Sequence, residues 1–543
     1  MEEKKDNQCS QNDDHPNIIK MPDEEPTSQY GVGYELFQNM KRHSEKIAQY
    51  IVETSESQTY AELLEECIKV AINLRAENLS SDDVVGLCMD NHKDVCVPYA
   101  ACLFLGIKVI PMSNGYVIPE ERCDLLKRVK PKIIFVDENV LEIFQNVVKI
   151  TNLNIKLVVL GENSVGETSY SDFLVASKED VDKFEPIKLE SNRGTAVLFS
   201  GSGTSGKVKA VCLSHHTLLT RIGGESLPLS IVLTRMYWIS HFLGTFSLLN
   251  TGSTRVAMKE TTEMNVWKAI EKYKIICLMG SVYQLNNLTK CTDLKDVDVS
   301  SLKFVVGGGI AFPVSTIRAL RTIIPRIVIL PAYGLTEIGG VALTFNLQNA
   351  QHRQWSMQKP TSCGTPIEGI WYKVVDPETE KIVGPNELGE LRLKSNLLMV
   401  EYYNMDSSDV YDAAGWFKTG DIFKYDEDNC FFMIERMKEM IRTERADIVP
   451  TKLEHLLMEH PMVHNAAVIG IPQSGGYEIP MGIVTLNRNC IIDPKELEDF
   501  VNSKVNPLHR LNGGVKIIQE MPMTGNGKLQ KRTLREMYQN GEL

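Results

Sequence analysis

Short apolar runs alternate with longer amphipathic stretches from about residue 35 to residue 430. The runs include VVGLCMD (84–90), KIIFVDE (132–138), TAVLFS (195–200) and RIVILPAYG (326–334), and a typical amphipathic stretch is YAELLEECIKVAINLRAE (60–77). This alternation predicts helices layered around largely parallel sheets, an α/β fold. Several of the runs end in glycine or an acidic residue, at the strand ends where open α/β sheets bind ligands.

The pattern changes beyond residue 430. PTKLEHLLMEH predicts a helix with a capping box from Thr451 to Glu454, and DPKELEDFVNSKV predicts a second helix with Asp493 as N-cap. NAAVIGIP, MGIVTLN and VKIIQE predict strands. A chain of 543 residues is also too long for one core. We therefore predict an acidic, disordered lead-in (1–30), a large α/β domain (31–435) and a smaller α+β domain (436–543).

Composition excludes several classes of function. A formal net charge of -12 argues against nucleic acid as a partner, because phosphate backbones need a basic face. No apolar run approaches the roughly 20 residues of a membrane span, and the first residues lack the apolar core of a signal peptide. The twelve cysteines are scattered without a C-x-x-C pair, as in reduced intracellular proteins. The final NGEL is not the S-K-L peroxisomal signal, so cytoplasm is the default expected location and the peroxisome the alternative.

The segment LFSGSGTSGKVKAVCLSH (198–215) resembles three phosphate-binding loops at once. Gly201, Gly203 and Gly206 fit the dinucleotide-binding pattern. The same glycines together with Val208 fit the Gly-rich loop of protein kinases. Gly201, Gly206 and Lys207 match most of a P-loop. The P-loop needs a hydroxyl after the lysine and a following helix, whereas VKAVCLSH is β-branched and alternating. The dinucleotide loop also needs the helix. The kinase motifs V-A-I-K, H-R-D and D-F-G are absent, so all three assignments fail.

What remains is a strand–loop–strand with hydroxyl side chains and Lys209 around three glycines. Small residues let backbone N–H groups close on a polyphosphate, and the hydroxyls add donors or a metal ligand. The same composition also suits a solvated hairpin, so the loop alone leaves both interpretations open.

Five segments in order resemble those of the adenylate-forming superfamily, which contains acyl-CoA synthetases, beetle luciferases and adenylation domains. They are the loop above, AYGLTE (332–337), GWFKTGD (415–421), IERMKEMI (434–441) and TGNGKLQKR (524–532). The resemblance runs from about residue 35 to the end, and its nearest branch is that of insect luciferase-like acyl-CoA synthetases and 4-coumarate-CoA ligase-like enzymes. Any one segment is modest support, whereas five in order are strong.

The resemblance implies ATP-dependent activation of a fatty or other hydrophobic carboxylic acid to acyl-AMP, with Mg²⁺, and then transfer to coenzyme A. It implies catalytic roles for Lys528, His241, Thr336 and Lys438. Nucleotide binding is implied for Ser202, Gly203, Thr204, Ser205, Gly206, Lys209, Gly309, Tyr333, Gly334, Thr336, Asp421 and Arg436. Metal binding is implied for Glu337 and Thr204, and a place in the acyl pocket for Arg221, Phe242, Leu243 and Ile310.

Departures from the family pattern keep alternatives open. Phe242 stands where the family has glycine and is expected to narrow the acyl pocket. Arg445 stands at the glycine that lets the pantetheine arm pass, where it either blocks coenzyme A or pairs with its phosphates. Val208 and Ala210 replace the proline and glycine of the phosphate loop. A luciferase-type monooxygenase and a non-catalytic nucleotide- or acyl-binding paralogue are the alternatives.

Overall fold

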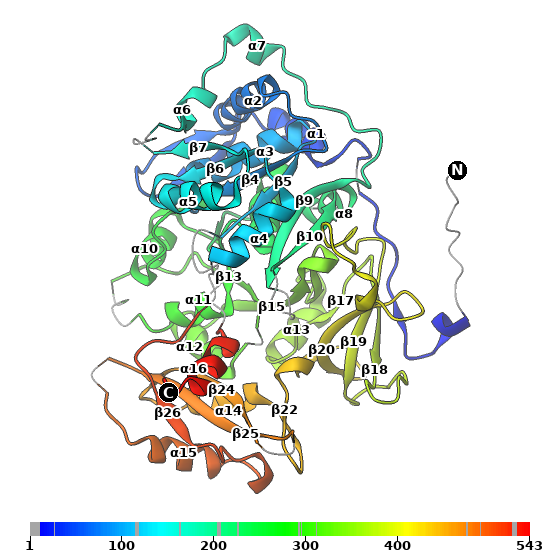
Figure 1. Ribbon diagram of the computed structural model, residues 1–543, viewed down its shortest axis with the longest axis vertical. Coiled ribbons are helices and arrows are strands. Elements are labelled where there is room, and N and C mark those ends of the chain that lie inside the picture. The colour runs from blue at the N-terminus through cyan, green and yellow to red at the C-terminus, as the bar shows by residue number, and fades with distance from the viewer. Residues whose placement is uncertain are drawn as a thin grey trace.

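A computed structural model describes residues 11–543 apart from 27, 114–118, 162–163, 165, 203–207, 225–226, 292–293, 295, 311, 474–475, 489 and 524–528. Two large sheets form the upper and middle parts of the molecule in Figure 1, a third sheet flanks them, and the C-terminal residues form a separate unit beneath. This arrangement confirms the predicted fold class, a large α/β region followed by a smaller α+β unit.

The first sheet has seven strands and is parallel except at β9 and β10. Its order is β10 (Val208–Ser214), β9 (Thr195–Ser202), β5 (Lys108–Pro111), β4 (Val84–Cys88), β6 (Ile133–Asp137), β7 (Lys156–Leu160) and β8 (Thr168–Ser169). Helices α2 (Tyr60–Ala76), α3 (Val97–Phe104), α4 (Pro119–Val129) and α5 (Leu141–Thr151) pack with it. Every residue of β4 and β6 is buried, which explains their continuous apolar sequences.

The second sheet has nine strands and carries helices from the middle of the chain. Its order is β17 (Thr365–Pro366), β16 (Gly340–Thr344), β15 (Val328–Leu335), β14 (Phe304–Gly308), β13 (Cys277–Ser281), β11 (Ser230–Val232), β12 (Arg255–Ala257), β2 (Ile47–Ile51) and β3 (Ser57–Thr59). The associated helices are α1 (Val32–Arg42), α8 (His215–Ile222), α9 (Ile239–Asn250), α10 (Glu263–Tyr273), α11 (Val282–Leu288), α12 (Val314–Ile323) and α13 (Ala350–Gln358). The largest hydrophobic core lies between the two sheets, where α1, α2, α3 and α9 meet.

The third sheet is antiparallel and includes part of the N-terminal segment. Its order is β1 (Ile19–Lys20), β18 (Trp371–Val375), β19 (Gly389–Lys394), β20 (Phe417–Tyr425) and β21 (Phe431–Arg436). The expectation of a disordered lead-in is wrong for residues 11–26. The carboxylate of buried Asp13 accepts a hydrogen bond from Trp416 Nε1 at 3.1 Å and pairs with Lys394 at 2.7 Å, and these contacts anchor the segment.

In its described residues, the C-terminal unit has two small sheets and three α-helices. β22 (Ile441–Arg442) and β23 (Asp447–Ile448) form a hairpin, and β24 (Val463–Pro472), β25 (Glu478–Leu486) and β26 (Val515–Ile517) form the second sheet. The helices are α14 (Pro450–Met458), α15 (Pro494–Asn502) and α16 (Lys531–Gln539). Asp493 caps α15 as predicted, by accepting a hydrogen bond from the Lys495 amide at 2.9 Å.

The predicted capping box of α14 is wrong. The N-cap residue is Val449, which has no side-chain acceptor, and Glu454 is buried and accepts from the Val468 amide at 2.8 Å. Glu435 of β21 caps the helix instead: its carboxylate accepts from the amide and the hydroxyl of Thr451, at 3.1 and 2.5 Å. The end of β21 is therefore fixed to the first turn of α14.

Among the described residues, no helix combines the length and the apolar character that crossing a bilayer requires.

Candidate active site

Side chains from three separate segments meet beside the end of β15. The Tyr333 hydroxyl donates to Asp421 Oδ2 at 2.7 Å, and Arg436 Nε lies 3.3 Å from Asp421 Oδ1. Asp421 and Arg436 are paired across β20 and β21, so strand register brings the carboxylate and the guanidinium together. Burial and the Asp421 carboxylate raise the pKa of Tyr333, which keeps its phenol protonated. This cluster contains three of the residues that the sequence assigns to nucleotide binding.

Glycine at position 334 is required by a close approach of two strands. β15 and β16 pair with a register irregularity between Tyr333 and Gly334, and a Cβ at Gly334 would lie 2.1 Å from the Gly340 carbonyl oxygen. The irregularity leads directly into a single 3-10 turn, Thr336–Ile338, which carries Thr336 and Glu337 away from the sheet. The short AYGLTE segment thus presents a ring, a hydroxyl and a carboxylate within five residues.

A second cluster combines a lysine, a tyrosine and a glutamate. The Tyr402 hydroxyl donates to Glu337 Oε1 at 2.9 Å, and Lys209 Nζ lies 4.2 Å from the centre of the Tyr402 ring. Residues 400–403 run alongside β10, with the Tyr403 amide donating to the Ala210 carbonyl at 2.8 Å, so Tyr402 is held next to Lys209 by backbone pairing. Burial and Glu337 raise the pKa of Tyr402, which therefore stays a hydrogen-bond donor.

The two clusters are electrostatically continuous. The pKa of Arg436 is raised chiefly by Asp421 and additionally by Tyr333 and Glu337, so its cation lies within the field of both carboxylates. Cations from β10 and β21 and carboxylates from β20 and the turn after β15 thus surround one region. Such a region can bind a nucleotide whose ribose needs acceptors and whose phosphates need cations.

The loop between β9 and β10 is described only at its base. Gly201 pairs with Lys209 and Ser202 with Val208 in an antiparallel register, which confirms the predicted strand–loop–strand. Gly203, Thr204, Ser205 and Gly206 lie outside the described residues, as does the Ser202 side chain.

Lys528 also lies outside the described residues. The residues on either side of its segment, Met523 and Leu529, form an antiparallel bridge. The nearby Lys531 is largely buried and pairs with Glu454 at 2.8 Å, so the structure assigns that basic residue to the packing of α16 on the C-terminal unit.

His241 is buried in α9, away from bulk solvent. Nδ1 lies 2.6 Å from the Thr234 carbonyl oxygen and Nε2 lies 3.2 Å from the Thr245 hydroxyl. Burial lowers the pKa of His241 to about 3, so the ring is neutral at physiological pH. The Thr234 carbonyl can only accept, so Nδ1 carries the proton and Nε2 is the acceptor.

The residues expected in the acyl pocket occupy different surroundings. Phe242 is fully buried and stacks on Phe246 with ring centres 4.5 Å apart. The side chain of Arg221 is also buried; its guanidinium donates to the Ile338 carbonyl at 3.3 Å and lies 3.9 Å from Glu24 of the N-terminal segment. Leu243 is half-buried beside the same hydrophobic core.

Ile310 is the exposed member of this set. It follows Gly309, whose φ of +95° turns the chain at the end of β14, and its side chain is 52% exposed. Ile310 lines a hollow together with Gly307, Pro331 and Ala332, next to Tyr333. Gly309 and Ile310 therefore lie at the same strand ends as the tyrosine cluster.

Lys438 and Arg445 belong to the connection between the units and the hairpin that follows it. Lys438 is exposed in a single turn directly after β21. Arg445 is exposed in the turn between β22 and β23, which is closed by a hydrogen bond from the Thr443 hydroxyl to the Ala446 carbonyl at 2.6 Å. Neither side chain lies in the Tyr333 or Glu337 cluster.

Sequence reasoning missed Tyr402 and the residues that hold Asp421 in place. Tyr402 lies 65 positions from Glu337 and carries no short-range pattern of its own. The sequence signal closest to it is the tyrosine pair in MVEYYN (399–404), which follows the strand GELRLK.

Comparison with known proteins agrees with the two-unit architecture. The family model described as AMP-binding enzyme matches residues 36–403, and the AMP-binding enzyme C-terminal domain matches residues 452–528. The luciferin 4-monooxygenase of Photuris pensylvanica is 28% identical over 96% of this chain and 98% of its own. The 4-coumarate–CoA ligase-like 9 protein of Arabidopsis thaliana is 28% identical over 91% of this chain and 87% of its own.

Solved structures give the same result. The luciferase-like enzyme of the nonluminescent Zophobas morio mealworm has a TM-score of 0.73 and 31% identity, covering 78% of this chain and 99% of its own. The anthranilate CoA ligase AuaEII, in complex with anthranoyl-AMP, has a TM-score of 0.83 at 21% identity over 95% of this chain and 98% of its own, a likeness of fold. The chain belongs to the AMP-binding, adenylate-forming enzyme family.

Proposed function

We propose that the protein activates a hydrophobic carboxylic acid with ATP, releasing pyrophosphate and forming acyl-AMP, and then transfers the acyl group to coenzyme A. The observation that carries the proposal is the convergence of Tyr333, Asp421 and Arg436 beside Glu337 and its partner Tyr402. These residues come from distant segments of a chain whose family is defined by adenylate chemistry.

In this proposal the first cluster binds the nucleoside. Asp421 accepts hydrogen bonds from the ribose hydroxyls, and Arg436 donates beside it. The ring of Tyr333 lies against adenine at the edge formed by Gly309 and Gly334, where the absence of side chains lets a base approach the backbone. Ser202, Gly203, Thr204, Ser205 and Gly206 contribute to the cradle of the phosphates.

The second cluster has the chemistry of a Mg²⁺–phosphate site. Glu337 supplies a hard oxygen donor for the metal and Thr336 a hydroxyl for a phosphate on one partly exposed turn, and Lys209 supplies a cation nearby. These donors fit magnesium, which would be held by Glu337 with Thr204 and would neutralise charge on the triphosphate. Tyr402 keeps the Glu337 carboxylate in a fixed orientation through its hydroxyl.

The first half-reaction joins two anions, so positioning and charge neutralisation dominate catalysis. A carboxylate oxygen attacks the α-phosphorus, the bond to the β-phosphate oxygen breaks, and pyrophosphate leaves. Lys528 is the proposed catalytic cation that reaches both anions. His241, being neutral, offers a hydrogen bond rather than a charge, and Arg221, Leu243, Phe242 and Ile310 shape the acyl pocket.

The second half-reaction forms a thioester. The thiol sulfur of coenzyme A attacks the acyl carbonyl carbon, its proton leaves, and AMP is released. Lys438 serves this step after the C-terminal unit rotates. Arg445 is exposed at the hairpin turn. In this proposal, either a phosphate or the pantetheine arm of coenzyme A passes beside it.

The experiment is mass spectrometry of the products formed from ATP, Mg²⁺, coenzyme A and a panel of fatty and aromatic acids, together with pyrophosphate release. Acyl-AMP and acyl-CoA from at least one acid are the expected products. Acyl-AMP without acyl-CoA would confine the activity to adenylation. Silence across the panel with ATP still bound would instead identify a non-catalytic binding protein.

Luciferase-type oxidation of the adenylate is a second candidate, because luciferin 4-monooxygenases are among the relatives. Phe242 argues against luciferin as the natural acid, since its buried ring fills space within the aromatic cluster. Light emission with ATP, Mg²⁺, oxygen and luciferin would establish this activity.

A further inference from the structure

The turn that carries Asp421 is an irregularity in the third sheet. Glu390 of β19 pairs with Ile422 of β20, and Arg392 pairs with Lys418, so the same stretch of ladder holds two more residues on β20 than on β19. Thr419, Gly420 and Asp421 form this bulge, and Gly420 has a φ of +70°. Bulges of this kind redirect side chains, and this one directs Asp421 toward Tyr333 and Arg436.

Two backbone amides of the bulge, those of Gly420 and Asp421, donate to side chains. The Gly420 amide donates to Glu390 Oε1 at 3.1 Å. The Asp421 amide donates to Thr419 Oγ1 at 3.1 Å, and the Thr419 hydroxyl in turn donates to the Leu391 carbonyl at 2.6 Å. The position of Asp421 thus depends on Glu390 and Thr419, which point at the backbone.

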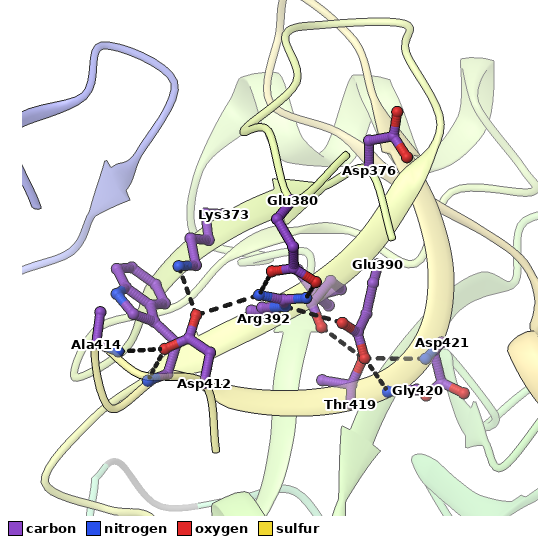
Figure 2. Close-up of polar contacts among 12 residues, drawn as sticks. Lys373, Asp376, Glu380, Glu390, Arg392, Asp412, Ala414, Thr419, Gly420 and Asp421 are labelled. Carbon is purple, nitrogen blue, oxygen red and sulfur yellow. Dashed lines mark hydrogen bonds and ion pairs between the residues drawn. The ribbon is translucent and has the colours of Figure 1, made fainter. Parts of the chain in front are cut away.

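Glu390 is buried and is itself held by a larger ionic cluster (Figure 2). Arg392 Nε lies 2.8 Å from Glu390 Oε2, and the other guanidinium nitrogens make a bidentate pair with Glu380 at 2.6 and 2.8 Å. Asp412 lies 3.3 Å from Arg392 and 2.8 Å from Lys373. A buried carboxylate needs a compensating charge, and Arg392 supplies it for Glu390.

We infer that Glu390 and Thr419 are positioning residues for nucleotide binding. Through the bulge of Thr419, Gly420 and Asp421 they fix the orientation of the Asp421 carboxylate, which accepts hydrogen bonds from the ribose hydroxyls. Arg392 holds Glu390 in place. The inference rests on the proposed nucleotide role of Asp421. It assigns ribose selectivity to side chains that touch no part of the nucleotide.

The test is the ratio of the dissociation constants of 2′-deoxyATP and ATP, measured with Mg²⁺ by calorimetry on the full chain. This ratio needs no acid substrate, and a general loss of stability does not change it selectively. We expect the unmodified protein to bind ATP at least about tenfold more tightly, because a buried carboxylate loses a partner when the 2′-hydroxyl is absent. Glu390→Ala and Thr419→Val are each expected to lower the ratio below about three.

Matched variants separate positioning from general damage. Thr419→Ser retains the hydroxyl that accepts from the Asp421 amide and donates to the Leu391 carbonyl, so it is expected to keep the ratio within twofold of the unmodified protein. Glu380→Gln weakens the ion pairs of Arg392 without touching the bulge, and it is also expected to keep the ratio within twofold of the unmodified protein. If Glu390→Ala does not fold, the inference is tested with Thr419→Val, which leaves every ion pair in place.

Asp421→Asn distinguishes failure of this inference from failure of the proposed function. If Asp421→Asn loses the ribose preference while folded Glu390→Ala and Thr419→Val keep it, the positioning roles are refuted and the nucleotide role of Asp421 stands. If Asp421→Asn itself keeps the preference, the ribose assignment and this inference are overturned together.

Discussion

The neutral state of His241 is set by burial and has a measurable consequence for stability. Its pKa is about 3 in the folded protein, against about 6.5 when the histidine is exposed on unfolding. Between these values the unfolded chain binds more protons, so the free energy of unfolding is fully retained above pH 6.5 and falls as the pH drops toward 3. At pH 5 the loss from this residue alone is about 2 kcal/mol relative to pH 7.

We therefore expect His241→Gln to reduce the pH dependence of stability, measured by denaturant titration at pH 5 and pH 7. Part of the dependence will persist, because burial also lowers the pKa of His215 to about 4. The same substitution at His15, which is exposed, serves as the control variant. An unaltered slope in the His241 variant would contradict the assigned neutral state.

Tyr402 is the residue whose role the structure adds to the proposed magnesium site. Tyr402→Phe keeps the ring beside Lys209 but removes the hydrogen bond to Glu337. Hydrogen bonds to charged groups contribute about 1.5–3 kcal/mol, so we expect pyrophosphate release to fall at least about tenfold at limiting Mg²⁺ and to recover partly at saturating Mg²⁺. A magnesium titration of initial rates measures the effect.

The neighbouring Tyr403 offers a matched control. Its ring packs against the hydrophobic core beneath β10 instead of the Glu337 cluster. Tyr403→Phe should leave the magnesium requirement unchanged. Equal magnesium curves for Tyr402→Phe and the unmodified protein would exclude the proposed orienting role.

At the scale of elements, the connection between the two units is tied to α14 through Glu435. The Glu435 carboxylate accepts two hydrogen bonds from Thr451 and so takes the place of an N-cap side chain. We expect Glu435→Ala to reduce the stability of the C-terminal unit by about 1–2 kcal/mol, the usual cost of a lost cap, and to speed hydrogen exchange in the first turn of α14. Glu439→Ala, which breaks a partly exposed pair with Arg535, should cost less than about 1 kcal/mol.

This cap illustrates what local sequence can and cannot predict. The strands β4, β6 and β15 and the helix α2 follow from patterns that span a few residues, because β4 and β6 are apolar and buried throughout, whereas burial in β15 and α2 repeats with the period of the element. A Thr451–Glu454 box satisfies the local rule equally well, but Glu454 is needed to pair with Lys531 in the core of the C-terminal unit. Tertiary pairing therefore replaced the local cap with one from residue 435.

The same distinction applies to the N-terminal segment and to the site. Residues 11–26 are polar and acidic, as in disordered chains, yet long-range contacts of Asp13 and Glu24 and the pairing of β1 with β18 attach them to the fold. Tyr333, Asp421 and Arg436 were identifiable because each lies in a short characteristic segment. Tyr402 and Glu390 were not, because their partners are brought together only by the register of strands.

At the scale of the whole molecule, the proposed chemistry is distributed over two units that meet at β21. The first unit holds the clusters of the proposed nucleotide site, whereas Lys528 and Lys438 belong to the C-terminal unit and the turn that precedes it. The units also touch at Lys290, whose amino group donates to the His464 carbonyl at 3.2 Å. The proposed rotation of the C-terminal unit assigns Lys528 and Lys438 to different half-reactions, so we expect the two half-reactions to be separable by mutation.

We expect Lys528→Ala to abolish acyl-AMP formation while ATP affinity stays within a few-fold, because in the proposed mechanism the lysine neutralises the reacting anions and the clusters of the first unit bind the nucleotide. Lys438→Ala should instead retain pyrophosphate release and lose at least about tenfold in acyl-CoA formation from preformed acyl-AMP. Single-turnover assays of each half-reaction measure both effects. Lys452→Ala, at an exposed lysine of the same unit, is the control, and Lys495→Ala is a second control. If both alanine variants lose the same half-reaction, the two lysines act in one orientation and the proposed rotation between steps is refuted.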